Sequence, residues 1–222
     1  MLITEELRLL LLRPDGRGES SAWSYRAYGE VAAVVVDLVL HRRVVVTDEK
    51  HPVVHVVQTT PTGHPVLDAT LARLAPLSGR RLSSLVTRSS LDPRDEVTAS
   101  LIAQGVLDHG ERGFFGLGAE RTPEADPHPE AALRSRLAAV LAGTIAPQQP
   151  DLTLLAILQA MNAAHSILRA ESGGLSAGRL KKRIAELAAG SPAGDAVSSA
   201  VSAVIVAMMT ATMIPVMVAT TS

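Results

Sequence analysis

Apolar residues recur every three or four positions along most of the chain, which is the spacing of one buried face of an α-helix. The clearest example lies within Ala22–His41, where the apolar positions follow this spacing over several turns. Further helices are predicted at Thr4–Leu12, Pro65–Ala75, Leu82–Thr87, Pro93–Gln104, Glu130–Ala142, Leu152–Ala170 and Leu175–Ala189. Because Leu152–Ala170 is apolar on nearly every side, we expect it to be the central buried helix.

Two pairs of short segments break this helical pattern. Val44–Val46 and Val53–Val57 are β-branched runs on either side of a turn-forming segment, which predicts a small β-hairpin. Val106–Asp108 and Phe114–Leu117 surround a glycine-containing tip and predict a second hairpin, after which a proline-containing connector follows. The chain is therefore predicted to form a mainly α-helical single compact domain over residues 1–222, with a central apolar helix and two small β-hairpins.

The C-terminal segment Ala196–Ser222 contains no charged residue and exceeds the roughly 20 apolar residues that a bilayer-spanning helix needs. Asp195 precedes it, Pro215 lies inside it, and Ser and Thr recur along it, all of which are unusual in a membrane span. We therefore interpret this segment as an apolar helix packed on the core, with a membrane anchor as the alternative.

The amino-acid composition argues against several classes of function. The formal net charge of −1 provides no basic surface of the kind that holds nucleic acid. The absence of cysteine excludes disulfides, thiol nucleophiles and Cys-ligated zinc, and is typical of the reducing cytoplasm. Glu5 and Glu6 stand where a secretory signal would be basic, so no export signal is expected. Arg outnumbers Lys eighteen to three, which is typical of a GC-rich bacterial genome.

No sequence motif predicts catalysis. Gly174, Ser176 and Gly178 match the nucleophile elbow of hydrolases, but they lie between two predicted helices and no histidine follows His165. The seven histidines are scattered without a carboxylate cluster, so we expect no metal site and no cofactor. These observations favour a binding module over an enzyme.

One pattern supports a nucleic-acid alternative. A helix starting at Asp92–Pro93 and followed by a glycine-tipped hairpin is the arrangement of a winged helix, whose recognition helix enters the major groove. The corresponding helix here, Arg94–Gln104, carries a single arginine and several aliphatic residues, too few groups for base and phosphate contacts. Nucleic acid is therefore the third hypothesis and is not the expected partner.

Four segments match the pattern of a known family: Glu5–Leu12, Asp37–Arg43, Pro61–Asp68 and Leu101–Leu107. The most specific match is Pro61–Gly63 with the downstream Leu67 and Asp68. Through these segments the chain resembles the Golgi phosphoprotein family of membrane adaptors, and in particular its bacterial members, over about residues 3–200. The resemblance implies a helical, non-catalytic, peripheral membrane protein that binds anionic lipid headgroups, of which phosphatidylinositol 4-phosphate is the family's own ligand. The resemblance also implies that this protein is located in the cytoplasm, peripherally bound to the inner face of the membrane.

The resemblance also implies a headgroup pocket. In the eukaryotic adaptors one Trp and three Arg hold the phosphate, because a guanidinium can donate two hydrogen bonds to its oxygens at once. Trp23 lies within one residue of the Trp position and Arg94 falls on one Arg position, whereas Val31 and Leu91 occupy the other two. Arg26 and Arg88 are the candidates that would compensate, so the predicted headgroup-binding residues are Trp23, Arg26, Arg88 and Arg94.

A second implied site is the hydrophobic hairpin with which family members contact membranes and one another. Its residues here would be Arg112, Phe114, Phe115 and Leu117, which include the only two phenylalanines of the chain. The expected partners are therefore an anionic membrane lipid and a second copy of the chain joined through the Phe114–Phe115 hairpin. A scaffold that binds proteins independently of lipid is the alternative function.

Overall fold

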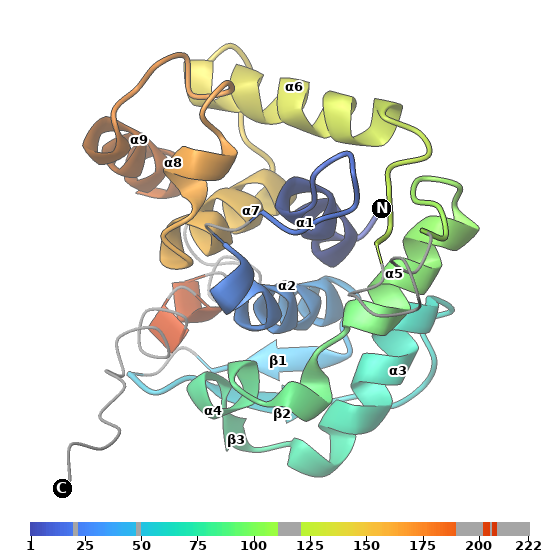
Figure 1. Ribbon diagram of the computed structural model, residues 1–222. Coiled ribbons are helices and arrows are strands. Elements are labelled where there is room, and N and C mark those ends of the chain that lie inside the picture. Colours follow the sequence, from blue (N-terminus) through green and yellow to red (C-terminus); the bar gives the residue numbers. More distant parts are fainter. Residues whose placement is uncertain (20–21, 48–49, 111–120, 190–201, 205, 208–222) are drawn as a thin grey trace, which may run out of the picture.

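The computed structural model describes residues 1–222 with the exception of 20–21, 48–49, 111–120, 190–201, 205 and 208–222. The described chain is mainly helical, as predicted, and carries one small antiparallel sheet (Figure 1). The α-helices are α1 (Ile3–Leu11), α2 (Arg26–Leu40), α3 (Pro65–Leu74), α4 (Leu82–Val86), α5 (Arg94–Ala103), α6 (His128–Ala142), α7 (Gln149–Ala160), α8 (Ala164–Ile167) and α9 (Ala177–Ala189). Short 3₁₀ helices are η1 (Trp23–Tyr25), η2 (Ala75–Leu77) and η3 (Ser89–Leu91), and the strands are β1 (Val44–Val46), β2 (Val53–Val56) and β3 (Arg80–Arg81).

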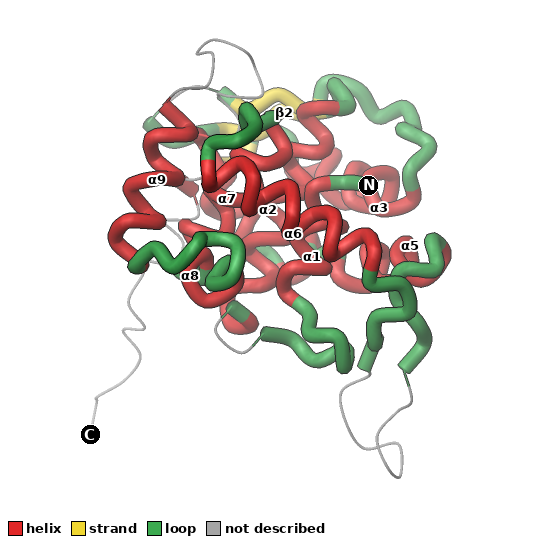
Figure 2. The backbone as a smooth tube through the Cα atoms, turned by 90° about the horizontal axis from the view of Figure 1, so that it is seen from above, coloured by secondary structure: helices red, strands yellow, loops and turns green. Residues whose placement is uncertain are grey.

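The centre of the fold is α2. Twelve of its fifteen residues are buried, and it contacts α1, α3, α4, α7 and β1. In Figure 1 it lies between the sheet below and α1 and α7 above, and Figure 2 shows the same helices from the perpendicular direction. The small aliphatic side chains of α2, mostly Val and Ala, allow this close packing on several sides.

The packing of α1 on α2 is fixed by a buried carboxylate. Asp37 of α2 accepts hydrogen bonds from the backbone N–H of Ile3 and of Thr4, both at 3.0 Å, and from the Thr4 hydroxyl at 2.6 Å. These amides belong to the first turn of α1, where no intrahelical acceptor exists. Asp37 therefore caps α1 from a neighbouring helix.

The prediction of one long helix over Leu152–Ala170 is wrong. The helix α7 ends at Ala160, and the separate short helix α8 follows it. Asn162 between them has φ +56°, a left-handed conformation that Asn adopts more readily than most residues and that cannot continue a right-handed helix. The central position that we expected for this segment belongs to α2, although eight of the twelve residues of α7 are buried.

The first predicted hairpin is confirmed. β1 and β2 pair antiparallel, with Val44 opposite Val56 and Val46 opposite Val54, so their buried side chains share the face that packs on α2. A third strand that the sequence did not predict, β3, pairs with β2. This strand consists of two exposed arginines. It is too short to show the alternation of apolar and polar residues from which strands are predicted.

The second predicted hairpin is described only at its base. Leu107 forms an isolated antiparallel bridge with Glu124, and Ala125 N–H donates to Val106 O at 2.9 Å. The segment that pairs with Val106–Asp108 is thus Pro123–Ala125, which we interpreted as a connector. The predicted strand Phe114–Leu117 lies outside the described residues.

Five residues of the apolar C-terminal segment are described, 202–204 and 206–207, and they are helical. Ala203, Val204 and Ala207 are buried in the core. The rest of the predicted C-terminal helix lies outside the described residues. In the part of the chain that the structure describes, no helix has both the length and the hydropathy to cross a bilayer.

Candidate functional site

Three of the four predicted headgroup residues meet at one place on the surface. Trp23 lies in η1 directly before α2, Arg26 is the first residue of α2, and Arg94 is the first residue of α5. The guanidinium carbon of Arg26 lies 5.5 Å from the centroid of the Trp23 ring, and that of Arg94 lies 5.9 Å from it. Both distances allow a cation–π interaction. The Trp23 side chain is 38% exposed, so the cluster is open to solvent.

The position of the Trp23 ring depends on Gly18. A Cβ atom at residue 18 would lie 1.9 Å from Cε3 of Trp23 and 2.2 Å from its Cζ3. Only a residue without a side chain can approach the ring so closely. Gly18 therefore belongs to the site, although the only local signal at this position is its place in a turn.

We expect Gly18→Ala to displace the Trp23 ring. Because Trp23 is the only Trp of the chain, its fluorescence reports this change directly, and the emission should shift to longer wavelength. The clash should cost about 1–3 kcal/mol of folding stability, the usual range for overpacking. Gly178→Ala is the matched control, since a Cβ there meets nothing within 4 Å. An unchanged emission spectrum in Gly18→Ala would show that the ring is not confined by this contact.

The guanidinium of Arg26 is already engaged by two carboxylates. Its Nη1 donates to Oδ1 of Asp92 at 2.9 Å and its Nη2 donates to Oδ2 at 2.5 Å, while Glu30 accepts a further hydrogen bond from Nη1. The Arg26 side chain is only 10% exposed. Burial by itself would lower the pKa of Arg26, but the bonds to Asp92 and Glu30 outweigh it and raise the pKa. Arg26 is thus a permanently charged residue whose donors are largely occupied.

Beneath Arg26 the charges continue into the core. Nε of Arg8 in α1 lies 3.0 Å from Oε1 of Glu30, and Nη2 of Arg8 donates a hydrogen bond to Oε2 of Glu30 at 3.0 Å. Both side chains are almost fully inaccessible to solvent. Burial lowers the pKa of Arg8 and raises the pKa of Glu30, and in each case the opposite charge counteracts it. We refer to Arg8, Glu30, Arg26 and Asp92 as the charge chain. It runs from the core to the surface and contains two cations and two anions.

Asp92 has a second role at the surface end of the charge chain. Its Oδ1 accepts the backbone N–H of Arg94 at 3.1 Å and so satisfies an amide of the first turn of α5. Burial would raise the pKa of Asp92, but the hydrogen bonds and the charge of Arg26 hold it below the ordinary value. The sequence marked Asp92 as a helix start, but not as the partner of an arginine 66 positions away.

Arg94 is the exposed cation of this cluster. Its side chain is exposed, and among the described residues no carboxylate lies within 4 Å of its guanidinium. Arg88 is also exposed, at the start of η3, but the structure shows no contact between Arg88 and the Trp23 ring. Val31 and Leu91, the residues that the resemblance predicts at the other two Arg positions, are both buried in the core.

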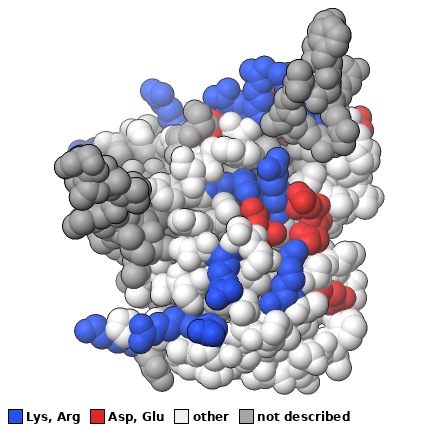
Figure 3. All heavy atoms as spheres, turned by 60° about the horizontal axis from the view of Figure 1, so that its bottom comes forward, with Lys and Arg blue, Asp and Glu red and all other residues white. Residues whose placement is uncertain are grey.

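Basic side chains are also distributed over the neighbouring face. Figure 3 shows Lys and Arg in several groups on the side that carries the sheet and α4, whereas the acidic side chains gather toward one part of it. The exposed basic residues of the sheet and its flanking loops are Arg42, Lys50, Arg80 and Arg81. The described residues of the sheet and its flanking loops, which we call the basic face, thus carry exposed basic and no acidic side chains, whereas Asp48 and Glu49 of the same segment lie outside the described residues.

The second predicted site is described only at its base. Arg112, Phe114, Phe115 and Leu117 lie outside the described residues. Two close approaches hold the base: a Cβ at Gly110 would lie 1.7 Å from the carbonyl oxygen of Arg121, and one at Gly16 would lie 2.6 Å from the backbone of Thr122. Gly16 belongs to the same turn as Gly18. The turn between α1 and η1 thus contacts both the base of the hairpin and the Trp23 ring.

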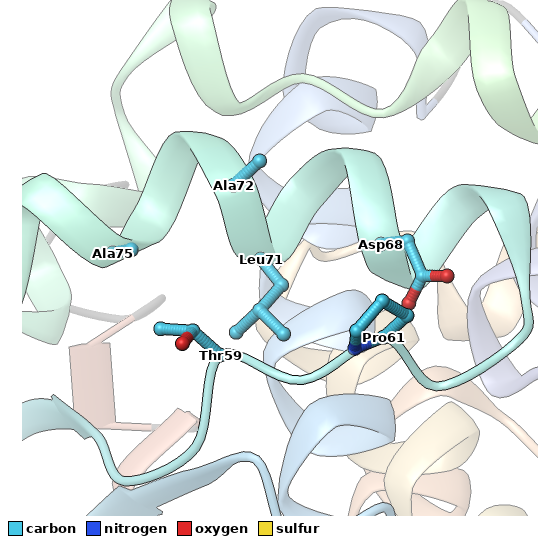
Figure 4. A pocket seen from close by; sticks show the side chains of 6 residues that line it. All are labelled: Thr59, Pro61, Asp68, Leu71, Ala72 and Ala75. Atoms are coloured by element: carbon cyan, nitrogen blue, oxygen red, sulfur yellow. The ribbon is translucent and has the colours of Figure 1, made fainter.

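A cavity of about 210 Å³ lies between α3 and the loop before it, lined by Thr59, Pro61, Asp68, Leu71, Ala72 and Ala75 (Figure 4). Its only charged group, Asp68, is bound by the backbone and hydroxyl of Thr62 and by the Gly63 amide. The one carboxylate that lines the cavity is therefore already hydrogen-bonded within the protein. Within the described residues, no three His, Asp or Glu side chains are grouped so that they could hold a metal ion.

Comparison with protein-family models identifies a match over nearly the whole described chain. The model described as Golgi phosphoprotein 3 (GPP34) matches residues 3–204. A search of curated proteins finds no matching sequence. The matched range contains every element from α1 to α9 and all four predicted headgroup residues.

Proposed function

Because the chain belongs to the Golgi phosphoprotein 3 family, we propose that it is a non-catalytic peripheral membrane protein that binds anionic lipid headgroups through Trp23 and Arg94. The observation that carries the proposal is the exposed, unpaired Arg94 guanidinium 5.9 Å from a partly exposed Trp ring. A guanidinium binds phosphate oxygens strongly, and Trp is favoured at the membrane–water interface. The pair suits a phosphate at a bilayer surface.

The neighbouring basic face supports the same proposal. Each Lys or Arg close to an anionic membrane contributes about 1 kcal/mol of attraction. Arg42, Lys50, Arg80, Arg81 and Arg88 are exposed and could act in this way without forming a pocket. Such binding depends on the charge of the surface more than on one headgroup, so we propose anionic lipids in general as the ligand class.

The proposal places the protein on the inner face of a bacterial membrane, in agreement with its arginine-rich and cysteine-free composition. The segment with Phe114 and Phe115 would add an apolar contact with the membrane or with a second copy. This contact belongs to the proposal because Thr122, at the base of that segment, packs closely against Gly16 in the turn beside Trp23.

We expect Arg94→Glu to weaken cosedimentation with anionic vesicles. The substitution changes the local charge by two, which at about 1 kcal/mol per charge corresponds to a roughly 30-fold loss in partitioning. The measurement compares the bound fraction of wild type and variant over a series of vesicle concentrations, with phosphatidylcholine vesicles as the neutral reference. Near-ultraviolet circular dichroism confirms that the variant is folded.

Arg169→Glu is the matched control for this experiment. Arg169 is exposed and follows α8, which lies on the opposite side of the molecule from α5 in both Figure 1 and Figure 2. It changes the net charge equally, so it should retain most of the binding. An equal loss in both variants would mean that net charge, and not the Trp23–Arg94 site, determines binding. Wild-type protein that stays in the supernatant with every lipid would instead favour the lipid-independent scaffold.

A further inference from the structure

The candidate site contains an anion of its own. The Asp92 carboxylate accepts hydrogen bonds from both terminal nitrogens of Arg26, at 2.9 and 2.5 Å. It also accepts one from the first backbone amide of α5, at 3.1 Å. A guanidinium fork and the N-terminal amides of a helix are two of the commonest binding groups for phosphate oxygens in proteins. Asp92 therefore occupies donors that would otherwise be offered to a phosphate.

The position of Asp92 lets it meet a ligand directly. Side-chain exposure rises along the charge chain from 0% at Glu30 to 10% at Arg26 and 21% at Asp92. Asp92 thus lies between Arg26 and the solvent, next to the exposed Arg94. Because Arg26 lowers its pKa, Asp92 stays ionised at neutral pH. A phosphate that approaches Arg94 and Trp23 therefore comes close to a permanent negative charge.

The charges at the site set a limit on the ligand. Within the charge chain, Arg8 and Arg26 are balanced by Glu30 and Asp92, which leaves Arg94 as the one uncompensated cation among the described residues in contact with Trp23. A phosphodiester headgroup carries one negative charge and matches this cation. A phosphomonoester carries between one and two charges at neutral pH and would leave negative charge facing Asp92.

We infer that Asp92 is a specificity-determining residue that makes the site select singly charged phosphodiester headgroups over phosphomonoester headgroups. The inference rests on the proposed function, because it concerns the choice among anionic lipids at the same site. Its consequence is that removing the Asp92 charge strengthens binding of a phosphomonoester lipid. A residue that only stabilised the fold would have the opposite effect.

The test uses Asp92→Asn in the full-length protein. Asn retains an oxygen that can accept the Arg94 amide, so the hydrogen bond at the start of α5 is preserved. Binding is followed through Trp23, the only Trp, as phosphatidylcholine vesicles containing either phosphatidylglycerol or phosphatidic acid are added. We expect the ratio of the affinity for phosphatidic acid vesicles to the affinity for phosphatidylglycerol vesicles to rise about tenfold in the variant. This is the effect of one charge-assisted hydrogen bond.

Three controls separate the outcomes. Asp95→Asn removes an equal charge from an exposed neighbour in the same helix turn and should leave the lipid preference unchanged. Asp92→Ser, which also has an uncharged oxygen acceptor, repeats the test if Asp92→Asn folds poorly. Inorganic phosphate without vesicles should leave the Trp23 emission unchanged, and a response as strong as that to vesicles would contradict a lipid-headgroup site.

The result also distinguishes this inference from the proposed function. If the wild type binds phosphatidylglycerol vesicles but neither Asp92 variant changes the ratio of the two affinities, the inference is wrong and the proposed function stands. If the wild type binds no anionic vesicle, the proposed function is wrong and the inference fails with it.

Discussion

A Glu30→Gln variant is expected to lose about 3–5 kcal/mol of folding stability, the usual effect of removing one partner of a buried ion pair. Glu30 is fully buried and lies between the guanidinium groups of Arg8 and Arg26. Glutamine has nearly the same shape but no charge, so it leaves two adjacent cations in the core without their shared anion. Urea unfolding of the variant and the wild type measures the difference.

The matched control is Glu186→Gln. Glu186 is 52% exposed and lies 3.9 Å from Lys182 within the same helix, a surface pair of the kind that contributes less than about 1 kcal/mol. We expect little change there. A loss of less than 1 kcal/mol in Glu30→Gln would mean that water or local rearrangement compensates the two arginines, and that the charge chain does not fix the site.

The stability of the protein should also depend on pH through Asp37. Burial raises the pKa of this carboxyl from its ordinary 3.8 to about 6, even though the hydrogen bonds from Thr4 and Ile3 oppose the rise. A carboxyl with a raised pKa binds its proton more tightly in the folded state than in the unfolded state. Its contribution to stability is therefore greatest below pH 3.8 and decreases as the pH rises through 6.

The size of this effect follows from the two pKa values. An interval from 3.8 to about 6 corresponds to about 3 kcal/mol, at about 1.36 kcal/mol for each pKa unit. Asp37→Asn cannot ionise, so its stability relative to the wild type should improve by most of this amount between pH 4 and pH 7.5. Urea unfolding of both proteins across this range gives the comparison. Parallel pH profiles would show that Asp37 does not titrate with a raised pKa.

The comparison of the two proteins isolates Asp37 from the other shifted groups. Burial also raises the pKa of Glu6 and Glu30, whereas Arg26 lowers that of Asp92. These groups are unchanged in Asp37→Asn, so their contributions cancel in the difference between variant and wild type. Only the part of the pH dependence that belongs to Asp37 remains.

The helices could be predicted from the sequence because most of them have one apolar face with regular spacing. Pro65 and the Asp92–Pro93 start marked the beginnings of α3 and α5 to within a residue or two. The end of α7 was missed because Leu152–Ala170 is apolar beyond Ala160. Only the left-handed conformation of Asn162 ends that helix, and Asn can occupy either state.

The site was predictable only in part, for a different reason. Trp23 and Arg94 were predicted from the family resemblance, which places Arg94 on one Arg position and Trp23 within one residue of the Trp position, and the structure brings the two side chains together. The state of Arg26 depends on Asp92, which is 66 positions away, and on Glu30, a charged residue inside an apolar helix face. Asp92 has no local signal, because an arginine near a helix start is as consistent with an anion site as with an ion pair. Glu30 follows Arg26 by four residues in the same helix, a spacing that allows an ion pair but does not show that both side chains are buried.

The fixed position of the Trp23 ring also depends on contacts distant from any motif. Because Gly18 has no side chain, the Trp23 ring can lie directly against it. Gly16 in the same turn likewise allows the close contact with Thr122 at the base of the second hairpin. In the sequence these glycines only indicated a turn. Their second role, to allow two close approaches, depends on which segments the fold places beside them.

Titration of the purified wild-type protein with neutral and anionic vesicles, read from the emission of Trp23, tests whether Trp23 and Arg94 bind lipid headgroups. We expect a saturable change in emission with anionic vesicles, no change with phosphatidylcholine alone, and release of the protein as salt screens the charges. An emission spectrum that is the same with every lipid would contradict the claim that Trp23 and Arg94 form a headgroup site.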